Sequence, residues 1–182
     1  MKYNHSCNKL EVKSSWRNKF MLRPLSEKDY NIAIDIVNTN WKRTYSNYVN
    51  PLLLNEIGCK ERAEELRHDF QSKRLSEYVW EEQGQILALL SIGDTADIDK
   101  KGAFEIWRIY VRPEAQGHNI GSKCILFAEQ EAKRQGYQEI VIWAFQENTT
   151  AISFYQKNGY VIDKNEYLGE PYLTFGIRLE RI

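Results

Sequence analysis

A short glycine-containing segment, residues 113–122 (PEAQGHNIGS), is the part of this chain best suited to binding an anion. It follows an apolar run and precedes a stretch whose apolar residues have helical spacing. A turn that enters a helix leaves several backbone N–H groups pointing the same way, at the positive end of the helix dipole. Gly117 and Gly121 allow close approach, and Asn119 tolerates a positive φ angle. Donor side chains flank the segment: Arg112, His118 and Lys123. These features predict a phosphate site, although an ordinary strand-to-helix turn would use the same residues.

Two common phosphate-binding loops are excluded by the residues of this segment. A P-loop needs GxxxxGK[ST], but Gly117 is followed by Gly121 four positions later, with no Lys-Ser or Lys-Thr pair after it. A Rossmann loop needs GxGxxG, which the chain does not contain. We therefore expect an anion site of another type.

The elements that position the segment are strands and helices in mixed order. Apolar and β-branched residues predict buried strands over 104–111 and 139–145, and a strand pair over 76–92 that turns near Gly84. The other expected elements are strands at 20–25, 160–167 and 172–180, helices at 27–40, 60–75 and 148–158, a helical stretch opening at Asn50-Pro51, and a helix from the end of the segment to about Gln135. This order predicts an α+β domain with a largely antiparallel sheet, whose centre holds a strand–loop–helix–strand unit that can be parallel.

Composition narrows the class of protein. The chain has 182 residues, with 25 Lys and Arg against 25 Asp and Glu, which indicates one domain and excludes a strongly basic nucleic-acid binder. No apolar run approaches the ~18 residues of a membrane span, and the N-terminus lacks a signal-peptide core. The three cysteines, Cys7, Cys59 and Cys124, have no metal-ligand spacing. We expect a soluble, cytoplasmic protein with reduced thiols, no metal and no membrane partner.

Two blocks of the sequence resemble the GNAT superfamily of N-acetyltransferases. The acetyl-CoA loop of that family reads Arg/Gln-x-x-Gly-x-Gly/Ala, after a strand that often reads Glu-x-x-x-Ile/Leu-Tyr-Val-x-Pro. This chain has EIWRIYVRP at 105–113 and QGHNIG at 116–121, with Asn119 in place of the first glycine. The second family block, Asn-x-x-Ala-x-x-Phe-Tyr-x-x-x-Gly-Phe/Tyr, is matched at 148–160. The blocks are in family order, and the resemblance covers roughly residues 20–180.

The resemblance implies the GNAT fold, a mixed and mostly antiparallel sheet flanked by helices, with acetyl-CoA in the cleft between the two central parallel strands. Residues 1–18 would then be an N-terminal extension and residues 19–182 the acetyltransferase domain. Acetyl-CoA is the implied cosubstrate, and an amine the implied acceptor. A homodimer through sheet edges or C-terminal strands is possible in this family.

The resemblance also implies which residues bind the cofactor. Backbone N–H groups of the loop would hold the pyrophosphate, main-chain groups of the preceding strand would pair with the pantetheine arm, and Asn148 would bond to the same region. Asn119 would place its side chain beside the pyrophosphate, so we expect binding there to be weaker or slightly displaced. The full predicted set is Ile109, Tyr110, Val111, Gln116, Gly117, His118, Asn119, Ile120, Gly121, Ser122 and Asn148.

Glu105 and Tyr155 are the candidate catalytic residues. Tyr155 matches the family position whose hydroxyl protonates the departing CoA thiolate, although the spacing also suits an ordinary helix face. Strand alternation places Glu105 on one face with three apolar residues, if no bulge intervenes: Trp107, Ile109 and Val111. An ammonium with a pKa near ~10.4 must lose a proton before it attacks, which costs roughly 4–5 kcal/mol at pH 7. A positioned carboxylate can accept that proton or bind the ammonium; the alternative for Glu105 is a strand-end charge or a salt bridge.

The acceptor is the least defined part of the prediction. We expect an amine to attack acetyl-CoA directly in a ternary complex, with no acyl-enzyme. Trp41, Tyr45 and Trp107 are candidates for acceptor binding, although aromatic residues at such spacing often only pack. A small-molecule amine is the expected acceptor. The alternatives are a protein or peptide amine, and a non-catalytic acyl-CoA-binding regulatory module.

Overall fold

The computed structural model describes residues 22–182, which form seven strands and four α-helices. The strands are β1 (Leu22–Pro24), β2 (Ser76–Glu82), β3 (Gln85–Asp94), β4 (Phe104–Val111), β5 (Ile140–Phe145), β6 (Val161–Tyr167) and β7 (Phe175–Arg181). The helices are α1 (Tyr30–Tyr45), α2 (Glu56–Ser72), α3 (Ile120–Gln135) and α4 (Thr149–Lys157). The predicted extension, residues 1–18, and the start of the strand expected at 20–25 lie outside the described residues.

All of these strands belong to one sheet, in the order β1-β2-β3-β4-β5-β7-β6. Neighbouring strands are antiparallel except β4 and β5, which are parallel and are joined through α3. The prediction of an α+β domain with a mostly antiparallel sheet is therefore confirmed, and so is its parallel strand–loop–helix–strand centre.

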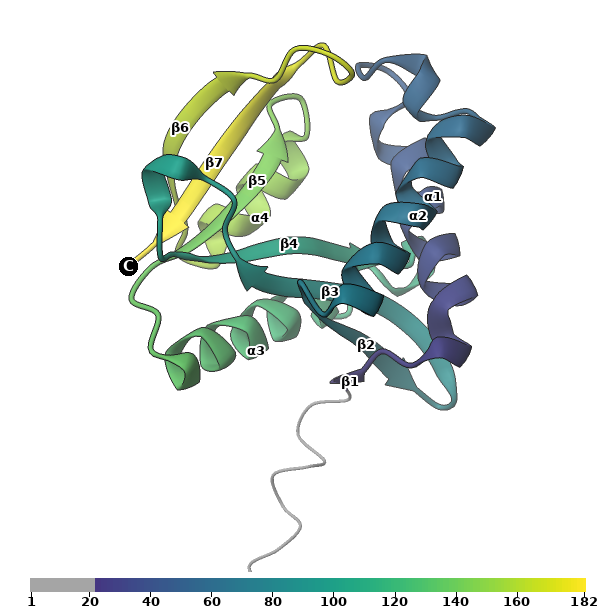
Figure 1. Cartoon of the computed structure of the whole chain (residues 1–182), viewed down its shortest axis with the longest axis horizontal. Helices are drawn as coiled ribbons and strands as arrows, with labels where there is room; N and C mark the ends of the chain where they lie inside the picture. Colours follow the sequence, from purple (N-terminus) through teal and green to yellow (C-terminus); the bar gives the residue numbers. More distant parts are fainter. Residues whose placement is uncertain (1–21) are drawn as a thin grey trace, which may run out of the picture.

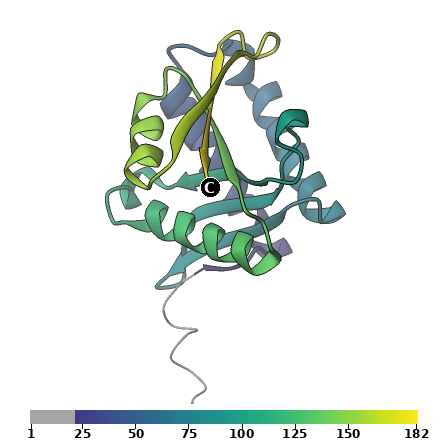
Figure 2. The ribbon, with the colours of Figure 1, turned by 90° about the vertical axis from the view of Figure 1, so that its left-hand side faces the viewer.

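Two hydrophobic clusters fill the two faces of this sheet. Leu90 and Ile106 belong to a cluster that includes residues of α3 and α4, whereas Leu89 belongs to a cluster with α1 and α2. Adjacent strand residues point to opposite faces, so Leu89 and Leu90 anchor opposite layers. Figure 1 shows α1 and α2 together on one side of the molecule and α3 below β4. Figure 2 shows the β6–β7 hairpin rising above α3, with α4 on one side and the short helix Ile98–Lys100 on the other.

Helix starts differ from the prediction in one region. The stretch at Asn50-Pro51 forms only the short 3-10 helix Pro51–Leu53, and α2 begins at Glu56. Asn55 caps α2, because its Oδ1 accepts the backbone N–H of Gly58 at 3.0 Å. Helix α1 also ends later than predicted, at Tyr45 instead of near residue 40. This longer helix carries its last turn over the C-terminal half of β4.

A β-bulge lies in the middle of β4 and changes which residues share a face. Ile92 of β3 lies opposite Ile106, whereas Ser91 lies opposite Arg108, so Trp107 is the extra residue. The predicted alternation therefore holds for Trp107, which lines the same cavity as Glu105, and is wrong beyond it. Ile109 and Val111 pack against the cluster on the α3 side, and the face of Glu105 continues through Arg108 and Tyr110. That face carries polar and aromatic groups instead of the expected aliphatic ones.

Candidate active site

The parallel pair β4–β5 separates partway along its length. Its register ends where Ile106 lies opposite Ile142, although both strands continue beyond that point. On the other edge, β4 remains paired with β3 as far as Val111. Figure 1 shows β5 turning steeply away from β4. The second half of β4 therefore has one edge that faces an opening instead of a strand.

Backbone groups of β4 line this opening. Arg112 donates its N–H to the carbonyl of Leu87 on β3 at 2.8 Å. Since backbone groups alternate in direction along a strand, Ile109 and Val111 direct theirs away from β3, towards the opening. The Val111 carbonyl already accepts two side-chain amides, each at 3.2 Å: Asn40 and Gln116. The remaining backbone groups are positioned to pair with an extended ligand.

The loop after β4 folds as a left-handed turn into α3. Gly117 has φ 83° and Asn119 has φ 66°, and Asn119 is the N-cap residue of α3. A Cβ atom on Gly117 would meet nothing within 4 Å, so glycine is needed there for its φ angle alone. A Cβ atom on Gly121 would lie 3.0 Å from Phe154 Cζ, so this glycine also lets α3 and α4 approach closely. The expected left-handed conformation of Asn119 is present.

A cavity of about 610 Å³, called the loop cavity below, joins this turn to the open edge of β4. It contains every predicted cofactor-binding residue except His118, whose Nδ1 instead lies 3.3 Å from the carbonyl of Ala115. Arg43 and Thr150 also line it, and no sequence signal had marked either. The predicted members are Ile109, Tyr110, Val111, Gln116, Gly117, Asn119, Ile120, Gly121, Ser122 and Asn148.

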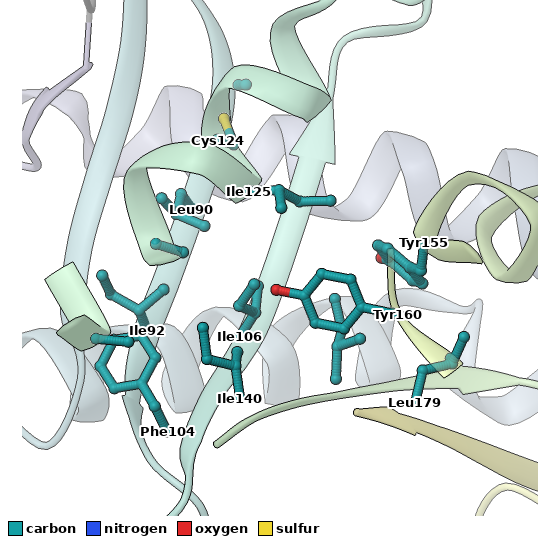
Figure 3. Packing of buried hydrophobic residues seen from close by; sticks show 14 of the residues in the cluster. Leu90, Ile92, Phe104, Ile106, Cys124, Ile125, Ile140, Tyr155, Tyr160 and Leu179 are labelled. Carbon is teal, nitrogen blue, oxygen red and sulfur yellow. The ribbon is translucent and has the colours of Figure 1, made fainter. Parts of the chain in front are cut away.

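Tyr155 lies on α4 at the wall of the loop cavity. Its ring is buried beside Phe154, at 5.4 Å between centroids, and burial raises the pKa of its hydroxyl well above the usual value. The phenol is therefore protonated at neutral pH. Figure 3 shows Tyr155 at the edge of the α3-side core, while Tyr160 extends its ring into that core. Only Tyr155 of this pair lines a cavity.

Glu105 lies in the paired half of β4 and is only 5% exposed. Its Oε2 accepts the hydroxyl of Thr95 at 2.8 Å, and no ion pair forms to it among residues 22–182. Burial raises the pKa of Glu105 to about 7, with Asp97 adding to the rise and Thr95 opposing it. A carboxylate with this pKa can accept a proton near neutral pH and release it again.

The loop between β3 and β4 fixes this carboxylate. Asp97 donates its backbone N–H to Thr95 Oγ1 at 3.1 Å, so the Thr95 proton is directed at Glu105. The Asp97 carboxylate accepts Trp143 Nε1 and Arg178, both at 2.9 Å. The loop was expected only as a charged connection. Hydroxyl and carboxylate partners so far from Glu105 in sequence carry no motif that would have revealed them.

A second cavity of about 460 Å³, called the Glu105 cavity below, lies next to the first. The predicted acceptor residues Trp41, Tyr45 and Trp107 all line it, together with Glu105. Tyr45 and Tyr110 line both cavities, so the two spaces meet at these rings. The cavity is also lined by residues that no sequence motif marked: Arg62 and Glu65 on α2, Trp143 on β5, and Tyr172 before β7.

Within residues 22–182, no group of three or more His, Cys, Asp and Glu side chains is arranged to hold a metal ion. No helix within that range is long and apolar enough to cross a membrane.

Comparison with known proteins identifies the family. The Acetyltransferase (GNAT) family matches residues 39–160. Spermidine N(1)-acetyltransferase of Thermoplasma acidophilum is 26% identical over 155 residues, which cover 80% of this chain and 90% of the relative.

Solved structures show the same fold. The PaiA N-acetyltransferase of Thermoplasma acidophilum in complex with coenzyme A has a TM-score of 0.66 at 21% identity, covering 88% of this chain and 96% of that one. YncA of Salmonella typhimurium with acetyl-CoA has a TM-score of 0.67 at 19% identity, covering 88% of this chain and 91% of that one. The chain therefore belongs to the GNAT family of acetyl-CoA-dependent N-acetyltransferases.

Proposed function

We propose that this protein transfers the acetyl group of acetyl-CoA to the primary amine of a small molecule. The observation that carries this proposal is the meeting of two cavities at Tyr45 and Tyr110, with Tyr155 on one side and Glu105 on the other. The loop cavity takes the donor and the Glu105 cavity takes the acceptor. A small amine is supported by the spermidine-acetylating relative, which covers most of this chain.

The loop cavity has the chemistry to hold acetyl-CoA. The left-handed turn at Gly117 and Asn119 leads into the N-terminus of α3, where backbone N–H groups favour the pyrophosphate. The open edge of β4 at Ile109 and Val111 suits the amides of the pantetheine arm. Once bound there, the cofactor supplies an acetyl thioester to the junction of the cavities. Backbone N–H groups of β4 stabilise negative charge on its carbonyl oxygen.

Glu105 prepares the acceptor for attack. An ammonium group has a pKa near ~10.4 and must lose a proton before its nitrogen can attack the thioester carbon. Glu105 accepts that proton, directly or through a water. Its raised pKa of about 7 makes it a stronger base than an exposed glutamate while leaving it largely ionised above neutral pH.

Tyr155 completes the transfer. Attack forms the new C–N bond and breaks the C–S bond, which leaves the electron pair on the CoA sulfur. Tyr155 faces the loop cavity and carries its proton at neutral pH, so it donates that proton to the leaving sulfur. The second proton, which the nitrogen loses as it becomes an amide, restores the phenol. No acyl-enzyme is needed, because both substrates reach the junction together.

The experiment is release of the CoA thiol from acetyl-CoA in the presence of polyamines, amino acids, aminoglycosides, simple monoamines and short peptides. The melting temperature is measured with and without acetyl-CoA on the same sample. Turnover with a small amine is expected, together with a rise in melting temperature. Turnover with peptides alone would move the acceptor to proteins. Stabilisation without any turnover would contradict the proposal and favour a non-catalytic acyl-CoA-binding module.

A further inference from the structure

The charges around the Glu105 cavity are almost entirely used by the chain itself. Of the four carboxylates that line it, three hold a cation of the protein: Glu65 with Arg108 at 2.7 Å, Asp97 with Arg178 at 2.9 Å, and Glu166 with Lys164 at 2.6 Å. Among residues 22–182, Glu105 forms no ion pair and accepts from neutral donors, the Thr95 hydroxyl and the Ala96 backbone N–H. The cavity therefore offers one carboxylate to an incoming ammonium.

The two guanidinium groups that line the cavity differ in their partners. Arg62 donates only to neutral acceptors: the side chain of Asn38 at 3.0 Å, the carbonyl of Leu53 and Cys59 Sγ. Arg108 donates to two carboxylates of α2: Asp69 at 2.8 Å and Glu65 at 2.7 Å. The polar groups thus disfavour an acceptor with several ammonium groups, whereas a carboxylate on the acceptor would have to displace the neutral partners of Arg62.

Three tryptophans form fixed parts of the cavity wall. The indole N–H of Trp41 donates to Tyr110 Oη at 2.9 Å, and that of Trp107 donates to the Asp94 carbonyl at 3.0 Å. The indole N–H of Trp143 donates to Asp97 Oδ2 at 2.9 Å. An arginine covers each ring, with its Cζ 4.4, 4.5 or 5.6 Å from the ring centroid: Arg62 on Trp41, Arg74 on Trp107 and Arg178 on Trp143. Because a cation already lies over one face of each ring, a second ammonium would gain less from the same rings.

An uncharged aromatic cluster forms another part of the wall, beside aliphatic residues such as Leu66 and Leu168. Phe145 lies 5.1 Å from Tyr45 and 5.6 Å from Tyr172, measured between ring centroids. The rings come from α1, β5 and the turn before β7, so they span the opening beyond the parallel pair. The Tyr45–Phe145 pair is edge-to-face and the Phe145–Tyr172 pair is tilted, and rings in such arrangements pack well against a further ring.

We propose that the acceptor is an arylalkylamine, with one ammonium group for Glu105 and an uncharged aromatic ring for the cluster of Tyr45, Phe145 and Tyr172. This inference rests on the proposed function, since it names the class of amine that the same site acetylates. An arylalkylamine is a different substrate from spermidine, which the name of the Thermoplasma relative gives. A polyamine such as spermidine would bring several ammonium groups to a cavity with one available carboxylate.

The test compares kcat/KM for four amines with the full-length protein and acetyl-CoA. They are 2-phenylethylamine, 2-cyclohexylethylamine, spermidine and phenylalanine. The cyclohexyl compound has the same carbon skeleton without aromaticity, and aromatic pairing predicts about a threefold to tenfold preference for the phenyl compound. Spermidine is expected to be at least about tenfold poorer, because its extra ammonium groups enter the cavity without partners. Phenylalanine is expected to be poorer by a smaller factor, because its carboxylate must displace the neutral acceptors of Arg62.

Two outcomes overturn the inference and differ from each other. Better use of spermidine than of 2-phenylethylamine, or equal use of the phenyl and cyclohexyl compounds, would show that the acceptor class is wrong while amine acetylation stands. No thiol release with any amine would overturn the proposed function, and the acceptor class with it.

A pair of variants ties the preference to the cluster. Tyr172→Leu removes one ring of the cluster and should lower the phenyl-to-cyclohexyl ratio towards one. Tyr167→Leu is the control, because Tyr167 is exposed, lies on the neighbouring strand β6 and does not line the cavity. It should retain the wild-type ratio. An unchanged ratio in Tyr172→Leu would count against the assignment of the ring to this cluster.

Discussion

The two cavities are built from different parts of the polypeptide. The loop cavity is lined mainly by one continuous segment, the end of β4, the turn and the start of α3, and it is closed by α1 and α4. The Glu105 cavity is made of large side chains from α1, α2, the β3–β4 loop, β4, β5 and the C-terminal hairpin. The loop cavity has a backbone geometry that suits one ligand, whereas substitutions of side chains in the Glu105 cavity can change which ligand it binds.

This difference decides which part of the site a sequence reveals. A backbone site needs particular φ angles at particular positions, so glycines and an asparagine mark it within a few residues. A side-chain site depends on the fold that brings distant residues together. The two regions should therefore also respond differently to substitution.

The largest effect is expected at the carboxylate of the Glu105 cavity. Glu105→Gln should lower kcat/KM by roughly 10²- to 10⁴-fold, because the ammonium loses its proton acceptor. Binding of acetyl-CoA, read from the melting-temperature shift, should not change. The wild-type kcat/KM should also fall about tenfold per pH unit below the Glu105 pKa of about 7, as the carboxyl group becomes protonated, and the variant should lack this acid limb.

Glu77 provides a matched control for this variant. It is also a buried strand carboxylate that accepts a serine hydroxyl, from Ser91, and burial likewise raises its pKa to about 7. It lines neither cavity, although, unlike Glu105, it has a cationic neighbour, Arg108, at 3.5 Å. Glu77→Gln should keep kcat/KM within a few-fold of wild type. An equal loss in both variants would mean that any buried carboxylate of this sheet supports the fold rather than the reaction.

A smaller effect is expected at the phenol of the loop cavity. A thiol has a pKa near ~8.5, so its thiolate is already a fair leaving group and needs less help from an acid than an amine or alcohol. Tyr155→Phe should therefore lower kcat only about 10- to 100-fold, near the low end of general-acid effects. Tyr160→Phe removes a hydroxyl from a buried ring that lines neither cavity, and it should leave kcat unchanged. Equal kcat values for the two variants would remove the acid role from Tyr155.

The fold and the loop cavity were largely predictable, whereas the Glu105 cavity was predictable only in part. Alternating and buried strands, and the spacing of glycines, report local backbone preferences that the structure retains. Trp41 and Tyr45 reach the cavity because α1 runs past its expected end. Helix α2 is capped by Asn55, five residues after the Asn50 at which a helical stretch was expected to open. The bulge at Trp107 has no composition signal, and it alone turns Arg108 towards α2. The register of β3 against β4 and the contacts between residues far apart in the sequence determine how the Glu105 cavity is built.

A substitution that strains the turn after β4 should weaken acetyl-CoA binding moderately and leave the Glu105 cavity unchanged. Gly117→Ala would force a side chain into a left-handed backbone conformation, at about 1 kcal/mol, which corresponds to about a fivefold to tenfold weaker affinity for acetyl-CoA. The amine KM at saturating acetyl-CoA should not move. Gly84→Ala carries the same strain in the β2–β3 turn, with φ 77° and no atom within 4 Å of a Cβ, but is remote from the loop. Titration calorimetry with CoA compares the two, and equal affinities would contradict the role of the turn.

The smallest effect tests whether the Glu105 cavity is tuned by its loop. The Thr95 hydroxyl bonds to Glu105 and holds its pKa down, so Thr95→Val should raise that pKa above about 7 and move the acid limb of kcat/KM to higher pH. A hydrogen bond of about 1 kcal/mol corresponds to roughly 0.7 pH units, or about a threefold to fivefold loss of activity below the pKa. The loss should vanish near pH 9, where Glu105 is ionised in both proteins, and Thr95→Ser should restore the wild-type profile. A deficit that persists at pH 9 would mean that Thr95 only holds the loop in place, since a structural defect does not disappear when one carboxyl group ionises.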